Sequence, residues 1–367
     1  MLTTLVFRVS AQEELKKKET PLDSFPTISL QEVKLTGIRA KQNTPVTFTN
    51  VTQKDIASRN LGQDIPILLN YLPAVVTTSD AGAGIGYTGI RVRGSDATRV
   101  NVTLNGIPYN DAESQGTFWV NLPDFASSIQ QIQLQRGVGT STNGSAAFGA
   151  SLNVETSGVQ QDAFTSLSSS IGSFNTLKNT FQFSSGVLND NFSFSGRLSK
   201  INSDGYIDRA ASNLDAYFFQ AAFQDNNTLI KALIFGGHEV TYQSWYGVDA
   251  QTLATSRTYN PAGEIYDSSG NLTGFYDNQV DDYTQDHYQL HWDEKINSIW
   301  SVSLGLNYTY GRGFYEEYND LWQDQNISFV GNTSFNYLQL DPYNIGETSI
   351  EAQKIFLKNG WITITMY

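Results

Sequence analysis

The chain has 367 residues, with 23 basic against 36 acidic side chains and a formal net charge of −13. This balance argues against nucleic-acid binding, because proteins that bind nucleic acids carry basic patches. There is no cysteine, so neither a disulfide framework nor a thiolate metal site can form. No apolar run reaches the ~18 residues that a membrane helix needs. A helical membrane protein is therefore excluded, whereas a β-barrel, whose signal is short alternating segments, is not.

The N-terminal 29 residues are predicted to precede any folded domain. Residues 1–7 are largely apolar and are followed by Ser10 and Ala11, small residues as at the end of a secretory signal. We interpret this segment as a signal remnant, with a frayed terminus as the equal alternative. Residues 12–30 are charged and interrupted by proline, which favours a flexible arm. The alternating residues 30–37 form either an ordinary edge strand or a strand that adds to a partner's sheet.

Residues 46–72 predict a strand and a helix. β-branched residues dominate residues 46–51, which favours a strand. The helix is predicted over residues 63–72, where Pro66 suits the first turn and Pro73 ends the pattern. Its apolar residues follow i, i+3, i+4 and i+7 spacing: Ile65, Leu68, Leu69 and Leu72. This face is expected to pack on the strands of the same domain.

Four short alternating segments predict strands: residues 90–94, 99–105, 131–136 and 152–154. In the first of them Arg91 and Arg93 share one face. Asn105-Gly106 is a strong two-residue hairpin signal, because both central positions of a type I′ turn need a positive φ. Together with the helix, these strands predict a small α/β domain that ends near residue 158.

A glycine-rich loop just before the first of these strands matches a dinucleotide-binding pattern. Residues 84–89 fit G-x-G-x-x-G, and Asp111 follows about twenty residues further on. Residues 90–93 predict a strand, whereas the dinucleotide fold needs a helix N-terminus there to hold the pyrophosphate. A loop whose glycines allow close backbone approach is the better interpretation, and a nucleotide-dependent enzyme is the weaker hypothesis.

After residue 160, helical periodicity gives way to long alternating segments. These segments are residues 177–183, 192–199, 217–223, 229–235 and 300–310. In the last of them Trp300, Leu304 and Tyr308 lie on a continuous apolar face with aromatic residues at both ends, and small or polar residues fill the other face. One lipid-facing side and one lumen-facing side are typical of a transmembrane β-strand. A water-soluble β-sandwich is the alternative.

The connections between these segments alternate in length. Short turns are expected at residues 187–190, 225–228 and 295–298, and long polar loops at residues 202–213, 241–282 and 311–347. Short turns at one end and long loops at the other are the layout of an outer-membrane barrel. Residues 350–357 and 361–367 are expected to pair around Asn359-Gly360, which brings the total to about seven to nine strands.

His287 and His291 share one face of a predicted strand, opposite Tyr288 and Trp292. Two imidazoles could bind a metal or haem, but no third ligand is close in sequence. Histidines solvated in a lumen or a loop are therefore the favoured interpretation. No nucleophile and base have a recognisable spacing, so the chain is not expected to be an enzyme or to carry a cofactor.

Several of these stretches resemble the TonB-dependent outer-membrane receptors, in which a plug domain precedes a β-barrel. Residues 90–94, IRVRG, and residues 104–111, LNGIPYND, carry the resemblance. Residues 132–139 and 144–154 are similar to the family's I-x-L-x-R-G and G-x-x-A-x-G-G-x-x-N-V pattern, with Phe148-Gly149-Ala150-Ser151 at the glycine pair. The resemblance implies an α+β plug domain followed by antiparallel transmembrane β-barrel strands.

The resemblance divides the chain into three regions. These are a signal remnant and flexible arm at residues 1–29, a TonB box and plug domain at residues 30–158, and the N-terminal part of an outer-membrane barrel at residues 159–367. Family barrels have about 22 strands, so the expected strands form an incomplete barrel and the chain is interpreted as a fragment. We expect this fragment alone not to transport, because a partial barrel leaves two unpaired edges in lipid.

The resemblance implies active uptake of a scarce ligand across the outer membrane of a Gram-negative bacterium. A ferric chelate, either a siderophore complex or ferric citrate, is the leading ligand class, and TonB supplies the energy. The alternative is a ligand-binding or adhesive β-rich surface module that does not transport. The expected partners are TonB on the periplasmic side, outer-membrane lipid and the small ligand, and not nucleic acid.

The resemblance also assigns site residues by position. The TonB box comprises Glu32, Val33, Lys34, Leu35, Thr36 and Gly37. The ligand is expected to meet the plug loops at residues 78–86 and 109–119 and their neighbours, through Ser79, Asp80, Tyr87, Tyr109, Asn110, Asp111 and Glu113. Arg91, Arg93 and Arg136 are expected to pair with acids of the barrel wall, in contacts that transport can break.

Overall fold

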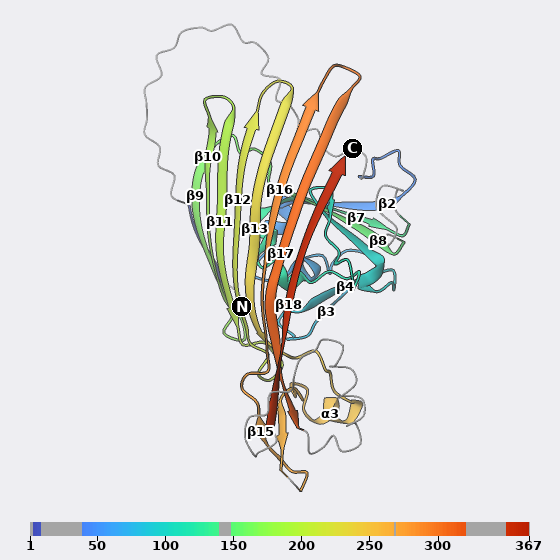
Figure 1. The fold of residues 1–367 in the computed structure, drawn as a ribbon, viewed down its shortest axis with the longest axis vertical. Helices are drawn as coiled ribbons and strands as arrows, with labels where there is room; N and C mark the ends of the chain where they lie inside the picture. The colour runs from blue at the N-terminus through green and yellow to red at the C-terminus, as the bar shows by residue number, and fades with distance from the viewer. Residues whose placement is uncertain (1–2, 9–38, 139–147, 268, 321–349, 367) are drawn as a thin grey trace.

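The computed structural model describes residues 3–8, 39–138, 148–267, 269–320 and 350–366. They form an N-terminal domain, residues 39–158, and a large curved antiparallel sheet that we call the wall sheet. Figure 1 shows the N-terminal domain packed on one side of the wall sheet, with the helix and hairpin of one long connection at the end of the molecule marked α3 and β15. β8 ends at Thr156 and β9 begins at Ala163, on either side of the boundary expected near residue 158.

The N-terminal domain is built on a five-stranded sheet with the order β2-β7-β8-β5-β6. The strands are β2 Thr47–Thr52, β5 Val100–Leu104, β6 Ile107–Pro108, β7 Ile129–Arg136 and β8 Ala150–Thr156. β5 and β8 run parallel, and the other neighbours are antiparallel. β3 Val75–Ser79 and β4 Thr88–Val92 form a separate two-stranded sheet. All five strands predicted for this domain therefore form, as β2, β4, β5, β7 and β8, although β4 belongs to the smaller sheet.

The predicted helix at residues 63–72 is wrong in length. Only Ile65–Leu68, α2, is helical, and the chain continues through turns in which the Leu72 N–H donates to the Leu69 carbonyl. Ile65, Leu68, Leu69 and Leu72 are nevertheless all buried, because a succession of turns presents the same apolar face to the core. A short helix that was not predicted, α1 Gln53–Ala57, begins at a capping box formed by Thr52 and Asp55.

The remaining helices are short 3-10 turns: η1 Ala97–Arg99, η2 Trp119–Asn121 and η3 Phe125–Ser128. Apolar residues of the sheet strands, of α1 and α2, and of η2 and η3 meet in one core, which also includes Phe218, Leu233 and Phe235 of the wall sheet. The two parts of the molecule thus share a continuous apolar interior.

The turn at Asn105-Gly106 confirms the predicted hairpin between β5 and β6. Asn105 has φ 53° and Gly106 has φ 83°, so both central positions lie in the left-handed region. The Asn105 side chain also accepts the Thr156 N–H at 2.9 Å, which joins the turn to the end of β8. The turn fixes the direction in which the chain leaves toward Tyr109.

Replacing Gly106 with alanine should destabilise the protein by about 1 kcal/mol, because the left-handed conformation places a Cβ too close to the following carbonyl oxygen. Thermal unfolding in detergent would show the loss as a lower midpoint. Gly274→Ala is the matched control, since a Cβ at Gly274 meets nothing within 4 Å. Equal midpoints for the two variants would contradict the prediction.

The wall sheet has nine strands, each antiparallel to its neighbours. In spatial order they are β1 Thr3–Arg8, β9 Ala163–Ile171, β10 Leu177–Leu188, β11 Phe192–Ser203, β12 Ser212–Gln224, β13 Thr228–Tyr242, β16 Val280–Lys295, β17 Ser301–Asp320 and β18 Ile350–Met366. Among the residues that the structure describes, β1 and β18 are the two edges, so the sheet is open, as expected of an incomplete barrel.

The two faces of the wall sheet differ in polarity in the way that the sequence predicted. Large apolar side chains point outward and stay exposed, for example Leu198 at 50%, Ile234 at 43% and Tyr308 at 41%. Polar side chains at alternate positions point toward the N-terminal domain and are buried, as Thr180 and Gln220 are. An apolar exterior around a polar interior is the pattern of a strand between lipid and a lumen.

Three details of the wall sheet differ from expectation. β17 continues to Asp320, through the first ten residues of the loop predicted at residues 311–347. β18 is one strand rather than a hairpin, because Asn359 and Gly360 pair with Gly311 and Tyr310 of β17 and are held extended there. β1 lies within the segment interpreted as a signal remnant. The assignment of residues 1–29 stays a prediction, because residues 9–29 lie outside the described residues.

The long connection between β13 and β16 contains structure of its own. α3 Ala250–Thr255 is followed by a hairpin of β14 Glu264–Tyr266 and β15 Leu272–Phe275. Arg209, from the connection between β11 and β12, lies 3.5 Å from the centre of the Phe275 ring. The long loops therefore contact one another. Within the described ranges, no helix combines the length and the apolar character that crossing a membrane requires.

Candidate ligand cavity between the N-terminal domain and the wall sheet

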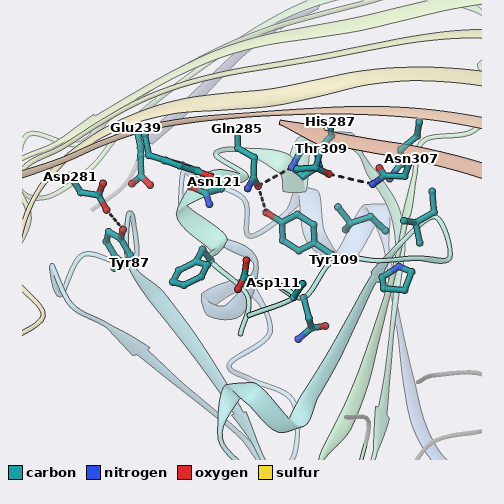
Figure 2. A pocket seen from close by; sticks show the side chains of 18 residues that line it. Tyr87, Tyr109, Asp111, Asn121, Glu239, Asp281, Gln285, His287, Asn307 and Thr309 are labelled. Carbon is teal, nitrogen blue, oxygen red and sulfur yellow. Dashed lines mark hydrogen bonds between the residues drawn. The ribbon is translucent and has the colours of Figure 1, made fainter. Parts of the chain in front are cut away.

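A cavity of about 360 Å³ lies where the loops of the N-terminal domain meet the inner face of the wall sheet (Figure 2). The N-terminal domain contributes Tyr87, Leu104, Ile107, Pro108, Tyr109, Asn110, Asp111, Ala112, Phe118 and Asn121. The wall sheet contributes Glu239, Asp281, Tyr283, Gln285, His287, Gln289, Asn307 and Thr309. The side formed by the wall sheet is thus aromatic, amide-rich and acidic. The side formed by the N-terminal domain is partly apolar.

Four of the seven predicted ligand residues line this cavity: Tyr87, Tyr109, Asn110 and Asp111. Ser79, Asp80 and Glu113 do not. Ser79 holds the glycine-rich loop, since its Oγ accepts the Gly84 N–H at 2.9 Å. The Glu113 backbone N–H donates to an Asp111 carboxylate oxygen at 3.0 Å. The ligand role of all seven residues stays a prediction.

The loop after β6 is held in place by side chains rather than by regular structure. The Asn110 side chain accepts the Val102 N–H at 2.7 Å and donates to the carbonyls of Val100 and Gln115. The Asp111 carboxylate accepts the Ser114 N–H at 2.7 Å, as in a local turn. These bonds satisfy the backbone where the loop departs from the sheet and fix the position of Tyr109 beside them.

Tyr109 joins the N-terminal domain to the wall. Its hydroxyl donates to Gln285 Oε1 at 3.3 Å, and its ring centre lies 5.5 Å from that of His287. Burial raises the pKa of Tyr109 above its usual value, and nearby Tyr283 and Glu239 raise it further. The hydroxyl therefore keeps its proton and remains a hydrogen-bond donor at neutral pH.

Tyr87 makes a second contact at the other end of the cavity. Its hydroxyl donates to the Asp281 carboxylate, and its ring packs edge-on against Trp245 of the β13–β16 connection, with centres 5.2 Å apart. Burial raises the pKa of Tyr87, as do the carboxylates of Glu239 and Asp281. This residue thus connects the N-terminal domain both to the wall sheet and to a long loop.

The glycine-rich loop before Tyr87 approaches the wall sheet closely. Within the motif, a Cβ on Gly86 would lie 2.8 Å from Ser212 Oγ at the start of β12, and a Cβ on Gly84 would lie 3.2 Å from Ile67. Both glycines also have positive φ. β4 begins at Thr88, so a strand follows the loop and no helix N-terminus is available for a pyrophosphate. Close backbone approach, rather than nucleotide binding, explains the G-x-G-x-x-G pattern.

The two histidines of β16 share the inner face, as predicted, but they are buried rather than solvated. His287 bonds to Thr309 Oγ1 and Gln285 Oε1, each at 3.0 Å, and His291 bonds to Gln289 Oε1 at 3.2 Å. The N-terminal domain covers them, which could not be inferred from the strand alone. Within the part of the chain that the structure describes, no group of three His, Cys, Asp or Glu residues is arranged to hold a metal ion.

A buried ion-pair network holds the N-terminal domain to β10 and β11. Asp124 lies 2.5 Å from Lys178 Nζ and 3.2 Å from a guanidinium nitrogen of Arg197, and all three side chains are almost completely buried. Thr180 and Ser199 donate to the same carboxylate at 2.7 and 2.6 Å. Burial alone would raise the pKa of Asp124, but the two cations outweigh it and hold the pKa well below its usual range.

Sequence reasoning missed this network. It predicted arginines on the N-terminal domain and acids on the wall, whereas here the acid lies on the domain and the two cations lie on the wall. The available signal was Lys178 and Arg197, two cations on the inward polar faces of β10 and β11. A full charge that faces a barrel interior needs a partner, and Asp124 supplies it.

The three arginines predicted to contact the wall lie elsewhere in the described part of the molecule. Arg91 and Arg93 are exposed. Arg136 donates from Nε to the Pro73 carbonyl at 2.9 Å and from a terminal nitrogen to Thr49 Oγ1 at 3.0 Å, both within the N-terminal domain. Their pairing with acids of the barrel wall stays a prediction. The predicted TonB box, residues 32–37, lies outside the described residues.

Residues 40–151 match the model of the TonB-dependent receptor plug domain. The N-terminal domain belongs to the family of TonB-dependent receptor plug domains. The N-terminal domain is therefore the plug, and the wall sheet is part of the barrel that surrounds it. The Asp124 network and the tyrosine contacts therefore join the plug to the barrel strands.

The chain is similar to several known proteins. The vitamin B12 transporter BtuB of Vibrio cholerae is 23% identical over 308 residues, which cover 82% of this chain and 48% of BtuB. The siderophore receptor PiuA of Acinetobacter baumannii matches 78% of this chain and 39% of its own, with a TM-score of 0.57 and 12% identity. The ferric-catecholate import receptor Fiu of E. coli K12, in its open form, matches 74% and 40%, with a TM-score of 0.56 and 16% identity.

The similarity to these solved structures establishes the fold alone. The chain spans about half the length of the curated relatives it matches.

Proposed function

We propose that the complete protein is an outer-membrane receptor that takes up a scarce ligand with energy delivered by TonB. A ferric chelate, such as a siderophore complex or ferric citrate, is the ligand class we favour. The cavity between Tyr109 of the plug and the inner face of the wall sheet carries this proposal, because a ligand held there touches both the plug and the barrel. Structural neighbours whose names include siderophore and ferric-catecholate receptors support a chelate.

The residues around the cavity suit binding rather than catalysis. Aromatic rings and amides supply stacking and hydrogen bonds, and the family consists of transport receptors. TonB would bind Glu32, Val33, Lys34, Leu35, Thr36 and Gly37 from the periplasmic side by adding them as a strand to its sheet. A non-transporting binding or adhesive module remains the competing function, since it would use the same cavity without TonB.

The test separates binding from transport in iron-starved cells of the native host. Val33→Pro removes a backbone donor from the predicted TonB strand, so radiolabelled ferric chelate should still bind at low temperature while its uptake falls to the level of a tonB deletion. Asp23→Pro, in the arm before the box, is the matched control and should transport normally. Binding without TonB-dependent uptake in the unaltered receptor would instead favour the non-transporting module.

A further inference from the structure

The cavity is lined by carboxylates without matching basic residues. Asp111, Glu239 and Asp281 line it, and its described lining includes no lysine or arginine. The Asp111 carboxylate is engaged by backbone N–H groups of its own loop. The two wall carboxylates, in contrast, have capacity left for a ligand.

Glu239 and Asp281 are close neighbours on the inner face. Glu239 pairs with Tyr283, and Asp281 pairs with Thr241, so the two acids are diagonal neighbours on β13 and β16. Figure 2 shows both carboxylates at the Tyr87 end of the cavity, directed from the wall toward the plug. Glu239 is 2% exposed and Asp281 is 7% exposed.

Each of these acids has an oxygen without a hydrogen-bond partner among the described residues, Oε2 of Glu239 and Oδ1 of Asp281. The other oxygen of Asp281 accepts the Tyr87 hydroxyl. Two adjacent carboxylates away from water repel each other and lack the hydrogen bonds that would offset their desolvation. A cation between them and the plug would supply both the opposite charge and the missing donors.

We propose that this end of the cavity binds a positively charged organic group of the ligand, an ammonium or a guanidinium. This inference rests on the proposed function and narrows it to a cationic ferric chelate, in place of an anionic one such as a tricatecholate or ferric citrate. An anionic chelate would bring further negative charge to Glu239 and Asp281, where the described lining offers no lysine or arginine to offset it.

The surroundings favour an organic cation over a bare metal ion. The described residues provide no group of three metal-ligating side chains. The rings of Tyr109 and Tyr283 line the same cavity, and aromatic faces attract organic cations. Ile107, Pro108 and Phe118 provide an apolar surface for the carbon stem that carries the charge.

The experiment compares three radiolabelled chelates on cells of the native host: a ferric trihydroxamate with a free primary ammonium, the same chelate with that amine acetylated, and a trianionic ferric tricatecholate. Binding is measured at low temperature and uptake at growth temperature, with and without TonB. The receptor carries Glu239→Gln, Asp281→Asn, or Asp190→Asn as the control, since Asp190 lies exposed in the β10–β11 turn.

The ammonium chelate should bind the unaltered receptor about tenfold more tightly than its acetylated form, and each wall variant should abolish that difference, because one charged partner of a desolvated pair is lost. Asp190→Asn should keep the difference. Equal binding of the two trihydroxamates, tighter binding of the tricatecholate, or wall variants without effect would overturn the inference.

Failure of the inference and failure of the proposed function give different results. TonB-dependent uptake of the tricatecholate that is unaffected by Glu239→Gln would overturn the inference and support the function. Binding of the ammonium chelate that depends on Glu239, without TonB-dependent uptake, would support the inference and overturn the function. Binding of calcium ions alone at Glu239, with no preference among the chelates, would overturn the inference.

Discussion

Replacing Asp124 with asparagine should destabilise the plug within the barrel by about 3–5 kcal/mol, because it leaves the buried charges of Lys178 and Arg197 without their partner. Asparagine keeps the shape of the side chain, so the loss of stability measures the effect of removing the negative charge. The measurement is thermolysin cleavage of the plug in outer-membrane vesicles over a urea series, which gives the free energy of plug opening.

Two further variants make the Asp124 result specific. Asp190→Asn removes an exposed carboxylate and should leave the free energy of opening unchanged. Adding Lys178→Met and Arg197→Met to Asp124→Asn should restore most of the stability, because apolar side chains of similar volume can replace a buried ion network. If Asp124→Asn opens no more readily than Asp190→Asn, the network does not hold the plug.

Replacing Phe125 with alanine should cost about 3–5 kcal/mol, the usual range for truncating a buried aromatic residue. Phe125 is 2% exposed, and its ring centre lies 5.1 Å from that of Phe235 and 6.3 Å from that of Phe218. It is thus a plug side chain inserted between two aromatic residues of the wall sheet. Hydrogen exchange measured by mass spectrometry should show faster exchange in η3 and in β7.

The matched control for Phe125 is Phe118, another plug phenylalanine, which is 44% exposed. Phe118→Ala should change the free energy of unfolding by about 1 kcal/mol or less. If the two alanine variants exchange at the same rate in η3 and β7, the shared apolar interior contributes little to plug retention.

Much of the fold follows from local sequence patterns. The alternation of rings with small polar residues predicts β10 to β13 and β17, because a strand between two different media must repeat every second residue. Asn105-Gly106 predicts its hairpin for a similarly local reason. The length of the helix at residues 63–72 was overestimated, because one helical turn followed by non-helical turns gives the same apolar spacing.

The candidate site was only partly predictable. Tyr87 and Tyr109 line the cavity because they follow glycine-rich and hairpin turns that project loops from the plug, and their ligand role stays a prediction. Glu239 and Asp281 were missed, since an inward polar residue on a strand looks the same in sequence whether it meets water or a covering domain. Asp124 and Arg197 are 73 positions apart and lie in different domains, so no local pattern connects them.

The Asp124 network and β2 lie on different parts of the plug, and this separation has a mechanical consequence. β2 is an edge strand with β7 as its one neighbour, and it is the first plug strand after the N-terminal arm. Tension applied at residue 39 would first load the Arg39–Glu155 ion pair and the hydrogen bonds between Ala40 and Gln133, which reach β8 and β7, and then β2. The ion pairs of Asp124 to β10 and β11 would act as a tether, so the plug would open from its β2 edge while the segment around Asp124 stays attached to the barrel.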